Sequence, residues 1–478
     1  MNRREFLGVS ASGCALPILR PLAPVGAATP RRHSAPGKNI AQRKNLSKLT
    51  KEEWELFESA IIEMKNQKNN LGYNQFANFH NTSCAHRNWF FFPWHRAYLY
   101  YFEVLCRKLT KESFALPYWD WSTDRAVPQR FLDKKSPLYF EDRALKGKDF
   151  PTEADIGSKA ISDLLATSSF RSFGGTATDL KANDSRTPGA AGGIEGGPHN
   201  IIHEYVGRAA REGDKHSAMF GNRAALDPLF WVHHANLDRI WMRWCVTELK
   251  GRTKQWPSQK GNSWAATKFE FVTVNAVDKS IFVEDCLSTY DLGYTYDEFA
   301  KEEAKTGAKR LDSVVKFLNV NASAVNAAEQ ELGAALNIKR PAVMTLKPSN
   351  VFLKNLRDNL AESSKKGTHV ESRVRIEFQS VPHGGGRVRV FVNNPDANSS
   401  TRVTDPSYAG FISFFSPHSA HKEDDPKEEY ILDIGKTLAK FEVKEDATIT
   451  VTCVAEGWWS DAPDALIRRI SVEIAEQT

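Results

Sequence analysis

Hydrophobic and polar positions follow two different periods along this chain, and the change of period divides it into two parts. Over residues 49–245 apolar side chains recur at helical spacing, and Thr50 with Glu53 three residues later is typical of a capping box that opens a helix reaching Met64. From Arg373 the period changes to two, which is typical of β-strands. The pattern predicts an α+β protein that begins mainly helical and ends in a β-sandwich.

The strands of the second part are expected as one hairpin followed by several short runs. Residues 374–378 and 388–392 alternate apolar and polar side chains on either side of Gly384-Gly385-Gly386, which predicts that they pair as a β-hairpin. Further strands are expected over residues 411–415, 430–434, 441–443 and 449–454.

Two stretches lack a regular period. Residues 176–198 are rich in Gly, Ala, Asp and Thr and predict a long loop that approaches a functional site. Residues 301–349 mix Lys, Glu, Ala and Asn and end in Lys339-Arg340-Pro341, which predicts a helix-bearing linker with an exposed place for a protease to cut. The expected domains are a helical domain over residues 28–300, this linker, and a β-sandwich domain over residues 350–478.

Composition excludes several classes of protein. The chain has 478 residues, 41% hydrophobic and 26% charged, which is typical of a folded protein of several domains without a membrane span. The formal charge is +6, but residues 1–32 hold five Arg and one Glu, so the remainder carries only +2. We therefore expect no nucleic-acid or membrane partner; the sequence leaves the oligomeric state open.

The N-terminus has the composition of a targeting segment. Arg3-Arg4 is followed by an apolar stretch to Leu19 and by small residues ending at Ala27, so residues 1–27 resemble a twin-arginine signal peptide. This resemblance predicts export to the periplasm or beyond; the alternative is an amphipathic start without a targeting role. Six widely spaced Cys include Cys14, and the odd number left after cleavage excludes a dense disulfide scaffold.

Histidine placement carries the candidate chemistry. Eight of the 13 His lie between residues 80 and 234, and seven of them form two groups: His80, His86, His95, and then His199, His203, His233, His234. His199 and His203 are four residues apart, which places both imidazoles on one face of a helix. Any one of these residues alone is more often a core histidine satisfied by its neighbours, but seven in an aromatic setting are hard to satisfy without a metal.

The kind of ligand narrows the choice of metal. Imidazoles without a carboxylate or a pair of thiolates suit copper or zinc, and two groups that each supply three ligands imply two ions. A pair of copper ions in a dry pocket can activate O2 for the oxygenation of a phenol ring.

Four motifs, in order along the chain, resemble those of the type-3 copper family of tyrosinases, catechol oxidases and plant-type polyphenol oxidases. They are residues 91–96 (FFPWHR), 117–121 (PYWDW), 199–203 (HNIIH) and 227–239 (DPLFWVHHANLDR). The resemblance implies a helical catalytic domain built round a four-helix bundle that holds two copper ions, followed by a shielding β-sandwich. Residues 294–296 (YTY) resemble the motif that closes the catalytic domain and are expected to pair with Arg43. Residues 408–418 resemble the plant-type C-terminal domain.

The same resemblance assigns roles to single residues. It implies that copper A binds His80, His86 and His95 and that copper B binds His199, His203 and His234. The residues themselves leave His233 and His234 open for the last position. A thioether between Cys84 and His86 is also implied; the alternative is a buried free cysteine.

Further assignments concern the phenol. Glu195 and Asn200 are implied to hold and orient a water that removes the phenol proton, unless they are only a loop carboxylate and a surface amide. Glu204 is expected to disfavour acidic phenols at the entrance. Gly221 stands where relatives place a bulky residue, which predicts an open entrance with room for a side chain of the shielding domain.

The resemblance implies an enzyme that uses O2 to hydroxylate monophenols and to oxidise o-diphenols to o-quinones. It also implies latency until the C-terminal domain is displaced, whereas the alternative for that domain is a role in stability or assembly. The alternatives for the whole chain are a catechol oxidase without monophenol activity, a haemocyanin-like oxygen carrier and a copper store.

Overall fold

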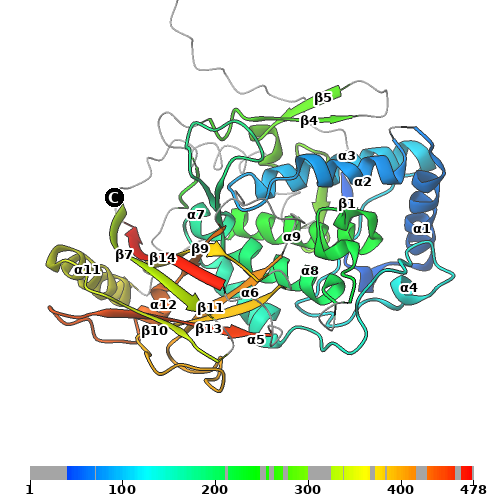
Figure 1. Ribbon diagram of the computed structural model, residues 1–478. Coiled ribbons are helices and arrows are strands. Elements are labelled where there is room, and N and C mark those ends of the chain that lie inside the picture. The colour runs from blue at the N-terminus through cyan, green and yellow to red at the C-terminus, as the bar shows by residue number, and fades with distance from the viewer. Residues whose placement is uncertain are drawn as a thin grey trace, which may run out of the picture. The chain divides into compact units, whose positions relative to one another are not determined.

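The structure is a computed structural model, and its described residues all fall in one compact unit, residues 36–478. They are residues 40–69, 71–209, 214–247, 254–257, 263–272, 278–299, 325–336, 339–366, 372–382, 385–415, 428–457 and 465–475. Helices dominate up to residue 246 and strands dominate from residue 325 (Figure 1).

The bounds of the elements follow the chain. The helices are α1 (Lys51–Asn66), α2 (Tyr73–Ser83), α3 (Phe91–Thr110), α4 (Gln129–Leu132), α5 (Glu153–Ile156), α6 (Ser158–Leu165), α7 (Phe170–Gly174), α8 (Asn200–Gly207), α9 (Pro228–Val246), α11 (Asn350–Lys366) and α12 (Gly435–Leu438). The first six strands are β1 (Ala41–Arg43), β2 (Thr176–Ala177), β3 (Gly189–Ala191), β4 (Lys268–Val272), β5 (Asp278–Phe282) and β6 (Tyr294–Tyr296). The others are β7 (Val325–Leu336), β8 (Ala342–Leu346), β9 (Ser372–Ser380), β10 (Gly386–Val392), β11 (Tyr408–Phe414), β12 (Glu428–Asp433), β13 (Ile449–Glu456) and β14 (Ala465–Ala475).

The helix starts predicted from capping residues are confirmed. Thr50 and Glu53 form the reciprocal capping box of α1, in which each side chain accepts a hydrogen bond from the backbone N–H of the other residue. Asp227 caps α9 by accepting from the N–H of Leu229, and Pro228 is the first helical residue, where its missing N–H costs nothing.

The helical part packs around aromatic side chains. Helix α3 is buried along most of its length, and the Phe102 ring stacks on Trp231 of α9 with 3.8 Å between centroids. Helices α2, α3, α8 and α9 each carry one of the six predicted metal ligands. The other two lie next to these helices, His86 after α2 and His199 directly before α8. A single aromatic core therefore fixes the relative positions of the helices that carry the predicted ligands.

A buried ion cluster closes the helical part. Strand β1 pairs in parallel with β6, and the guanidinium of Arg43 lies 3.6 Å from the ring centroid of Tyr294. Arg43 also donates to Glu103 at 2.8 Å and to Asp238 at 3.2 Å, and all three charged side chains are buried. The predicted pairing of Arg43 with the tyrosine motif is confirmed.

The C-terminal strands form two sheets packed face to face. One sheet has the order β11-β10-β13-β8, and the other has the order β2-β3-β12-β9-β14-β7. Apolar side chains of both sheets share one core, for example Val390 and Cys453 from the first sheet and Ile376 and Ile470 from the second. The predicted α+β architecture with a terminal β-sandwich is confirmed. We call residues 325–475 the C-terminal sandwich.

Several details of the sandwich differ from the prediction. Residues 374–378 and 388–392 do not form a hairpin: β9 pairs with β12 and β14, whereas β10 pairs with β11 and β13. A period of two reports which side chains are buried and leaves the partner strand open. Residues 441–443 form no strand. Strand β14 was not predicted, because a register shift near Arg469 interrupts the alternation of apolar and polar side chains.

The predicted linker also differs from the structure. Strands β7 and β8 lie within residues 301–349, and they pair with β14 and β13 of the sandwich. The sandwich therefore begins by Val325, and Lys339-Arg340 lies in an exposed turn inside it. Residues 300–324 are outside the described part of the chain.

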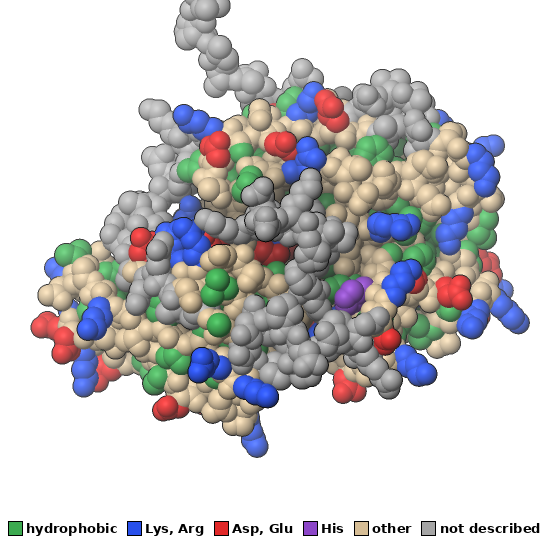
Figure 2. Space-filling model, viewed as in Figure 1, with side chains coloured by type: hydrophobic (Ala, Val, Ile, Leu, Met, Phe, Trp, Pro, Cys, Tyr) green, Lys and Arg blue, Asp and Glu red, His purple; other side chains and the backbone are tan. Residues whose placement is uncertain are grey.

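The surface carries both charges. On the face drawn in Figure 2, basic and acidic side chains of the described residues are interspersed. Among the helices that the structure describes, none combines the length and the apolar character that crossing a bilayer requires.

Candidate metal centre

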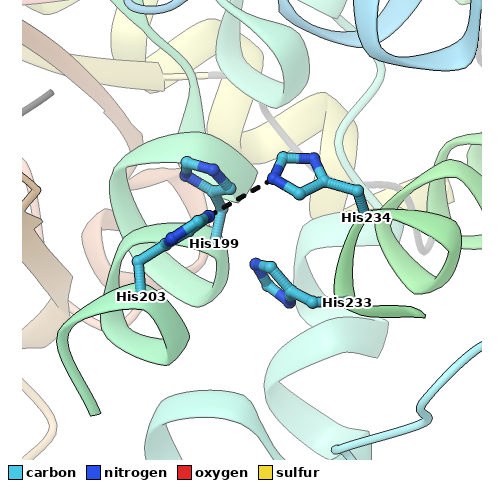
Figure 3. Close-up of side chains that lie close together, drawn as sticks. All are labelled: His199, His203, His233 and His234. Atoms are coloured by element: carbon cyan, nitrogen blue, oxygen red, sulfur yellow. Dashed lines mark hydrogen bonds between the residues drawn. The ribbon is translucent and has the colours of Figure 1, made fainter. Parts of the chain in front are cut away.

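The structure brings the seven predicted histidines together. Potential ligand atoms of His199, His203, His233 and His234 lie within 4.8 Å of one another, and their rings converge from α9 on one side and from α8 and the residue directly before it on the other (Figure 3). His80, Cys84 and His86 form a second such group at the end of α2. His95 of α3 joins the two groups, because its ring centroid is 5.1 Å from that of His86 and 4.4 Å from that of His234.

A π-helix carries one of the predicted ligands. It spans Glu195–His199, contains Pro198, and follows the short strand β3 directly before α8. This form of helix is rare and occurs mostly at functional sites. The long loop predicted over residues 176–198 thus ends at the metal centre, although it also contains β2 and β3.

Most of these imidazoles are held through Nδ1 and leave Nε2 without a protein partner. The Nδ1 atoms of His80, His95 and His203 contact the backbone oxygens of Asn222, Phe91 and Met219 at 2.7, 2.8 and 2.7 Å. Since a carbonyl oxygen only accepts, each of these rings carries its proton on Nδ1 and presents the Nε2 lone pair. Among the described residues the buried Nε2 atoms of His80, His86, His95, His199 and His233 have no hydrogen-bond partner.

The adjacent histidines differ in their ring contacts. The indole N–H of Trp121 donates to Nδ1 of His233 at 3.1 Å, so neutral His233 carries its proton on Nε2 and has no lone pair there. His234 places its Nε2 atom 3.3 Å from Nε2 of His203. Two nitrogens, each about 2.0 Å from a shared ion, are about 3.3 Å apart at a tetrahedral angle.

The imidazoles are neutral. Burial lowers the pKa of His80 to about 4, and burial with the neighbouring imidazoles lowers the pKa values of His95, His199 and His234 well below the ordinary value. Neutral imidazole is the form that binds a metal ion, so protons do not compete for these nitrogens at neutral pH.

Cys84 and Glu195 lie next to the first group. The Cys84 sulfur is 3.2 Å from Nδ1 of His86, and burial raises the pKa of this thiol to about 12. Glu195 is buried, and its Oε1 atom accepts from the backbone N–H of Arg87 at 2.6 Å. Burial raises the pKa of Glu195 to about 8.

The remaining predicted residues lie near the contact with the sandwich. Asn200 is buried; its Oδ1 contacts Nδ1 of His199 at 2.7 Å and its Nδ2 donates to the Ser413 oxygen at 2.6 Å. Glu204 pairs with Arg208 at 3.0 Å, which compensates its charge. Gly221 is half-buried in extended backbone and ends a 3-10 helix over Ala218–Phe220.

One side chain of the sandwich reaches the histidines. The ring centroid of Phe415, which follows β11, lies 4.4 Å from that of His203, 5.6 Å from His199 and 5.8 Å from His86. Phe415 is only 4% exposed.

Sequence reasoning missed several of these partners. Residues 408–418 resembled the family's C-terminal domain as a whole, and no feature singled out Phe415. Trp121 stood in a recognised motif without an assigned role. The backbone oxygens of Phe91, Met219 and Asn222 carry no side-chain signal that a sequence could reveal.

Seven neutral imidazoles lie close together, and five of them have buried Nε2 atoms without a partner among the described residues. This arrangement defines a protein that holds two transition-metal ions. The comparisons identify the family. The family model described as the common central domain of tyrosinase matches residues 70–154 and 128–247. A chloroplastic polyphenol oxidase of Malus domestica is 30% identical over 402 residues, which are 77% of this chain and 64% of that protein.

Two further comparisons agree. The chloroplastic catechol oxidase B of Solanum tuberosum is 32% identical over 261 residues, which are 47% of this chain and 43% of that protein. The solved structure of latent apple tyrosinase shares the fold, with a TM-score of 0.68 and 22% identity over 93% of this chain and 99% of that one. The chain therefore contains the common central domain of tyrosinase and is similar to plant polyphenol oxidases, and it spans less than two thirds of the length of these two curated relatives. The cofactor of this family is a pair of copper ions, which the buried imidazoles fit.

The predicted localisation is wrong. Relatives from Malus domestica, Vitis vinifera, Ipomoea batatas and Solanum tuberosum are chloroplastic proteins, which contradicts twin-arginine export to the periplasm or beyond. A basic, apolar N-terminus poor in acidic residues is common to several kinds of targeting segment, so the Arg pair does not choose among them. Residues 1–27 lie outside the described part of the chain.

Proposed function

We propose that this protein is a latent, copper-dependent phenol oxidase that uses O2. A pair of bound copper ions supplies the activation of O2. In the monophenol reaction, one oxygen atom enters the ring beside the hydroxyl group, the other leaves as water, and the product is an o-quinone. In the diphenol reaction, two o-diphenols are oxidised for each O2, which leaves as two waters. The observation that carries the proposal is the set of buried Nε2 atoms without protein partners.

The proposed ligands are three histidines for each ion. His80, His86 and His95 hold copper A, and His199, His203 and His234 hold copper B. The Nδ1 contacts of His80, His95 and His203 with backbone oxygens support this assignment, because they direct the free lone pair toward the ion. The Trp121 contact with His233 favours His234 as the sixth ligand.

Glu195 is the group that we propose to receive the phenol proton. An ordinary carboxylate is a weak acceptor for a phenol, whose pKa is about 10. Burial raises the pKa of Glu195 to about 8, so its ionised form is a stronger proton acceptor than an ordinary carboxylate, and the fraction in that form grows as the pH rises through 8. We also propose that Asn200 acts as its orienting partner, although both polar atoms of Asn200 are already bonded to protein atoms.

The proposed cause of latency is Phe415. Its ring packs against histidines of both groups, in the space that a phenol ring has to enter. The proposed domains are a catalytic domain up to residue 300 and a shielding domain that contains the C-terminal sandwich. Substitution at Gly221 is the proposed test of how open the entrance is once Phe415 is removed.

The test compares full-length, copper-loaded proteins by O2 uptake and quinone absorbance with a small catechol. Phe415→Ala is expected to oxidise catechol at least tenfold faster than the unchanged chain. Phe391→Leu is the matched control, because Phe391 is buried in the sandwich against Tyr408, away from the histidines. His95→Ala is expected to be inactive. Absence of catechol oxidation by Phe415→Ala protein that holds two copper ions would overturn the proposal.

Monophenol activity is tested separately. With the Phe415→Ala chain, Glu195→Gln is expected to slow monophenol hydroxylation by about 100-fold and catechol oxidation by less, because removal of the phenol proton matters more for the monophenol. If Phe415→Ala protein oxidises catechols and never a monophenol, even after a long lag, the enzyme is a catechol oxidase.

A further inference from the structure

A strand of the helical part belongs to a sheet of the C-terminal sandwich. Strand β3 pairs in parallel with β12, with Ala190 opposite Glu429 and Ala191 opposite Tyr430. Only three residues separate β3 from the π-helix that ends at His199. The sandwich is therefore hydrogen-bonded to the segment that delivers a ligand of the second histidine group.

The π-helix also lies against the sandwich through side chains. A Cβ atom on Gly196 would come within 2.8 Å of the Tyr430 ring, so the glycine is what allows this close contact. On α8, Glu204 accepts from the Ser413 hydroxyl at 2.7 Å. Strands β11 and β12 thus contact the chain before and after His199.

One contact reaches the ring of His199 itself. Ser413 accepts from Nδ2 of Asn200 through its backbone oxygen, and Oδ1 of the same amide contacts Nδ1 of His199. An amide turns as a unit, so the Ser413 oxygen keeps Nδ2 on its own side and Oδ1 toward the imidazole. His199 must then carry its proton on Nδ1, which leaves the Nε2 lone pair free. Without Ser413, Asn200 is able to turn and offer an N–H to Nδ1, which favours the tautomer that cannot bind a metal through Nε2.

The ring protons of the first histidine group do not depend on contacts with the sandwich. The Nδ1 partners of His80 and His95 are backbone oxygens of the helical part, and His86 lies beside Cys84. The sandwich does contact this side, because Arg87 pairs with Glu428 and Phe415 packs on His86. The ion pair holds the Arg87 side chain, and Phe415 covers the His86 ring. Neither contact decides which nitrogen of His86 carries the proton.

We propose that the C-terminal sandwich positions a copper B ligand, with Ser413 acting through Asn200 on His199, in addition to shielding the site. This inference rests on the proposed function and deepens it. Displacing the sandwich then weakens copper B selectively and leaves copper A in place. Asn200 and Ser413 are positioning residues in this scheme.

The experiment measures copper retention in full-length chains that hold one ion each. His203→Ala leaves the first histidine group able to bind copper, and His95→Ala leaves the second. Each protein is loaded with copper and dialysed against a chelator, with and without a low detergent concentration that loosens the sandwich, and copper per chain is followed by mass spectrometry. We expect detergent to speed copper loss about tenfold or more from His95→Ala and to change little in His203→Ala.

Two variants in the His95→Ala chain connect the effect to the proposed contact. Asn200→Leu is expected to lose copper about tenfold faster without detergent, and detergent is expected to add little. Ser413→Ala is the matched control. It removes the hydroxyl that bonds Glu204 and keeps the backbone oxygen that bonds Asn200, so retention is expected to stay unchanged because only the backbone oxygen acts on His199. Equal detergent sensitivity of His95→Ala and His203→Ala, or an undiminished detergent effect in Asn200→Leu, would overturn the inference. Phe415→Ala separates the two proposals, because it is expected to activate catechol oxidation while keeping both ions.

Discussion

At the scale of single residues, His233 and His234 are both buried but differ in whether Nε2 has a lone pair for a metal ion. The Trp121 indole N–H occupies Nδ1 of His233, which places the proton of the neutral ring on Nε2. We predict that His234→Gln lowers the copper content to one ion per chain and that His233→Gln keeps two. Both chains are measured by metal analysis after copper loading, with near-ultraviolet circular dichroism as the check on folding. Loss of copper from His233→Gln alone would reverse the assignment.

The cysteine beside His86 gives a second prediction at this scale. The Cys84 sulfur lies 3.2 Å from the His86 ring, and the thiol is protonated at neutral pH because burial raises its pKa to about 12. We predict that copper loading in air forms a thioether between Cys84 and a carbon of the His86 ring. The thiol hydrogen and one ring hydrogen are lost, with two electrons passing to O2. Intact-mass measurement is expected to find the chain lighter by two hydrogen atoms after loading, whereas Cys84→Ser keeps its mass. An unchanged mass in the parent chain would leave Cys84 as a free thiol.

At the scale of elements, the pairing of β1 with β6 depends on a buried ion cluster. Arg43 faces Glu103 and Asp238 without access to water, and Arg96 also pairs with Asp238. We predict that Arg43→Met lowers the free energy of unfolding by about 3 kcal/mol, because it leaves buried carboxylates with less opposite charge. Urea denaturation measures the change. The control is Lys51→Ala, whose exposed pair with Glu55 is expected to contribute less than about 0.5 kcal/mol. A loss for Arg43→Met no larger than for this control would show that the cluster is not needed.

Local sequence patterns predicted where helices and strands lie better than they predicted which strands pair. Thr50 and Asp227 marked the starts of α1 and α9, since a cap depends on residues within one turn. The strands at residues 374–378 and 388–392 were located correctly and paired wrongly, because alternation records burial and the neighbour is chosen by the whole sandwich. The histidines were found from the sequence because they are chemically unusual. The groups that orient these histidines could not be found from the sequence, because most of them are backbone oxygens, which every residue has.

At the scale of the whole molecule, the two parts are joined by more than a connecting segment. Strands β2 and β3 lie between residues that carry the metal centre, yet they extend the six-stranded sheet of the sandwich. Further ion pairs cross the same boundary, including Arg387 with Asp155 at 2.8 Å and Lys436 with Asp163 at 2.6 Å. Displacing the sandwich therefore requires breaking a shared sheet as well as removing Phe415 from the histidines.

This joining changes what proteolysis at the predicted cleavage site is expected to do. The exposed Lys339-Arg340 turn lies between β7 and β8, and these strands pair with β14 and β13 respectively. A cut after Lys339 leaves both strands hydrogen-bonded to the sandwich and leaves Phe415 at the histidines. We predict that the nicked protein elutes from gel filtration as one species and oxidises catechol as slowly as the intact chain. The comparison is a chain with a specific protease site inserted within residues 301–324, which precede β7. Cutting there and adding low detergent is expected to release the sandwich and raise the rate at least tenfold, provided that the assay holds free copper and no chelator, so that copper B is kept. Activation by the cut at Lys339 alone would mean that β7 is enough to hold Phe415 in place.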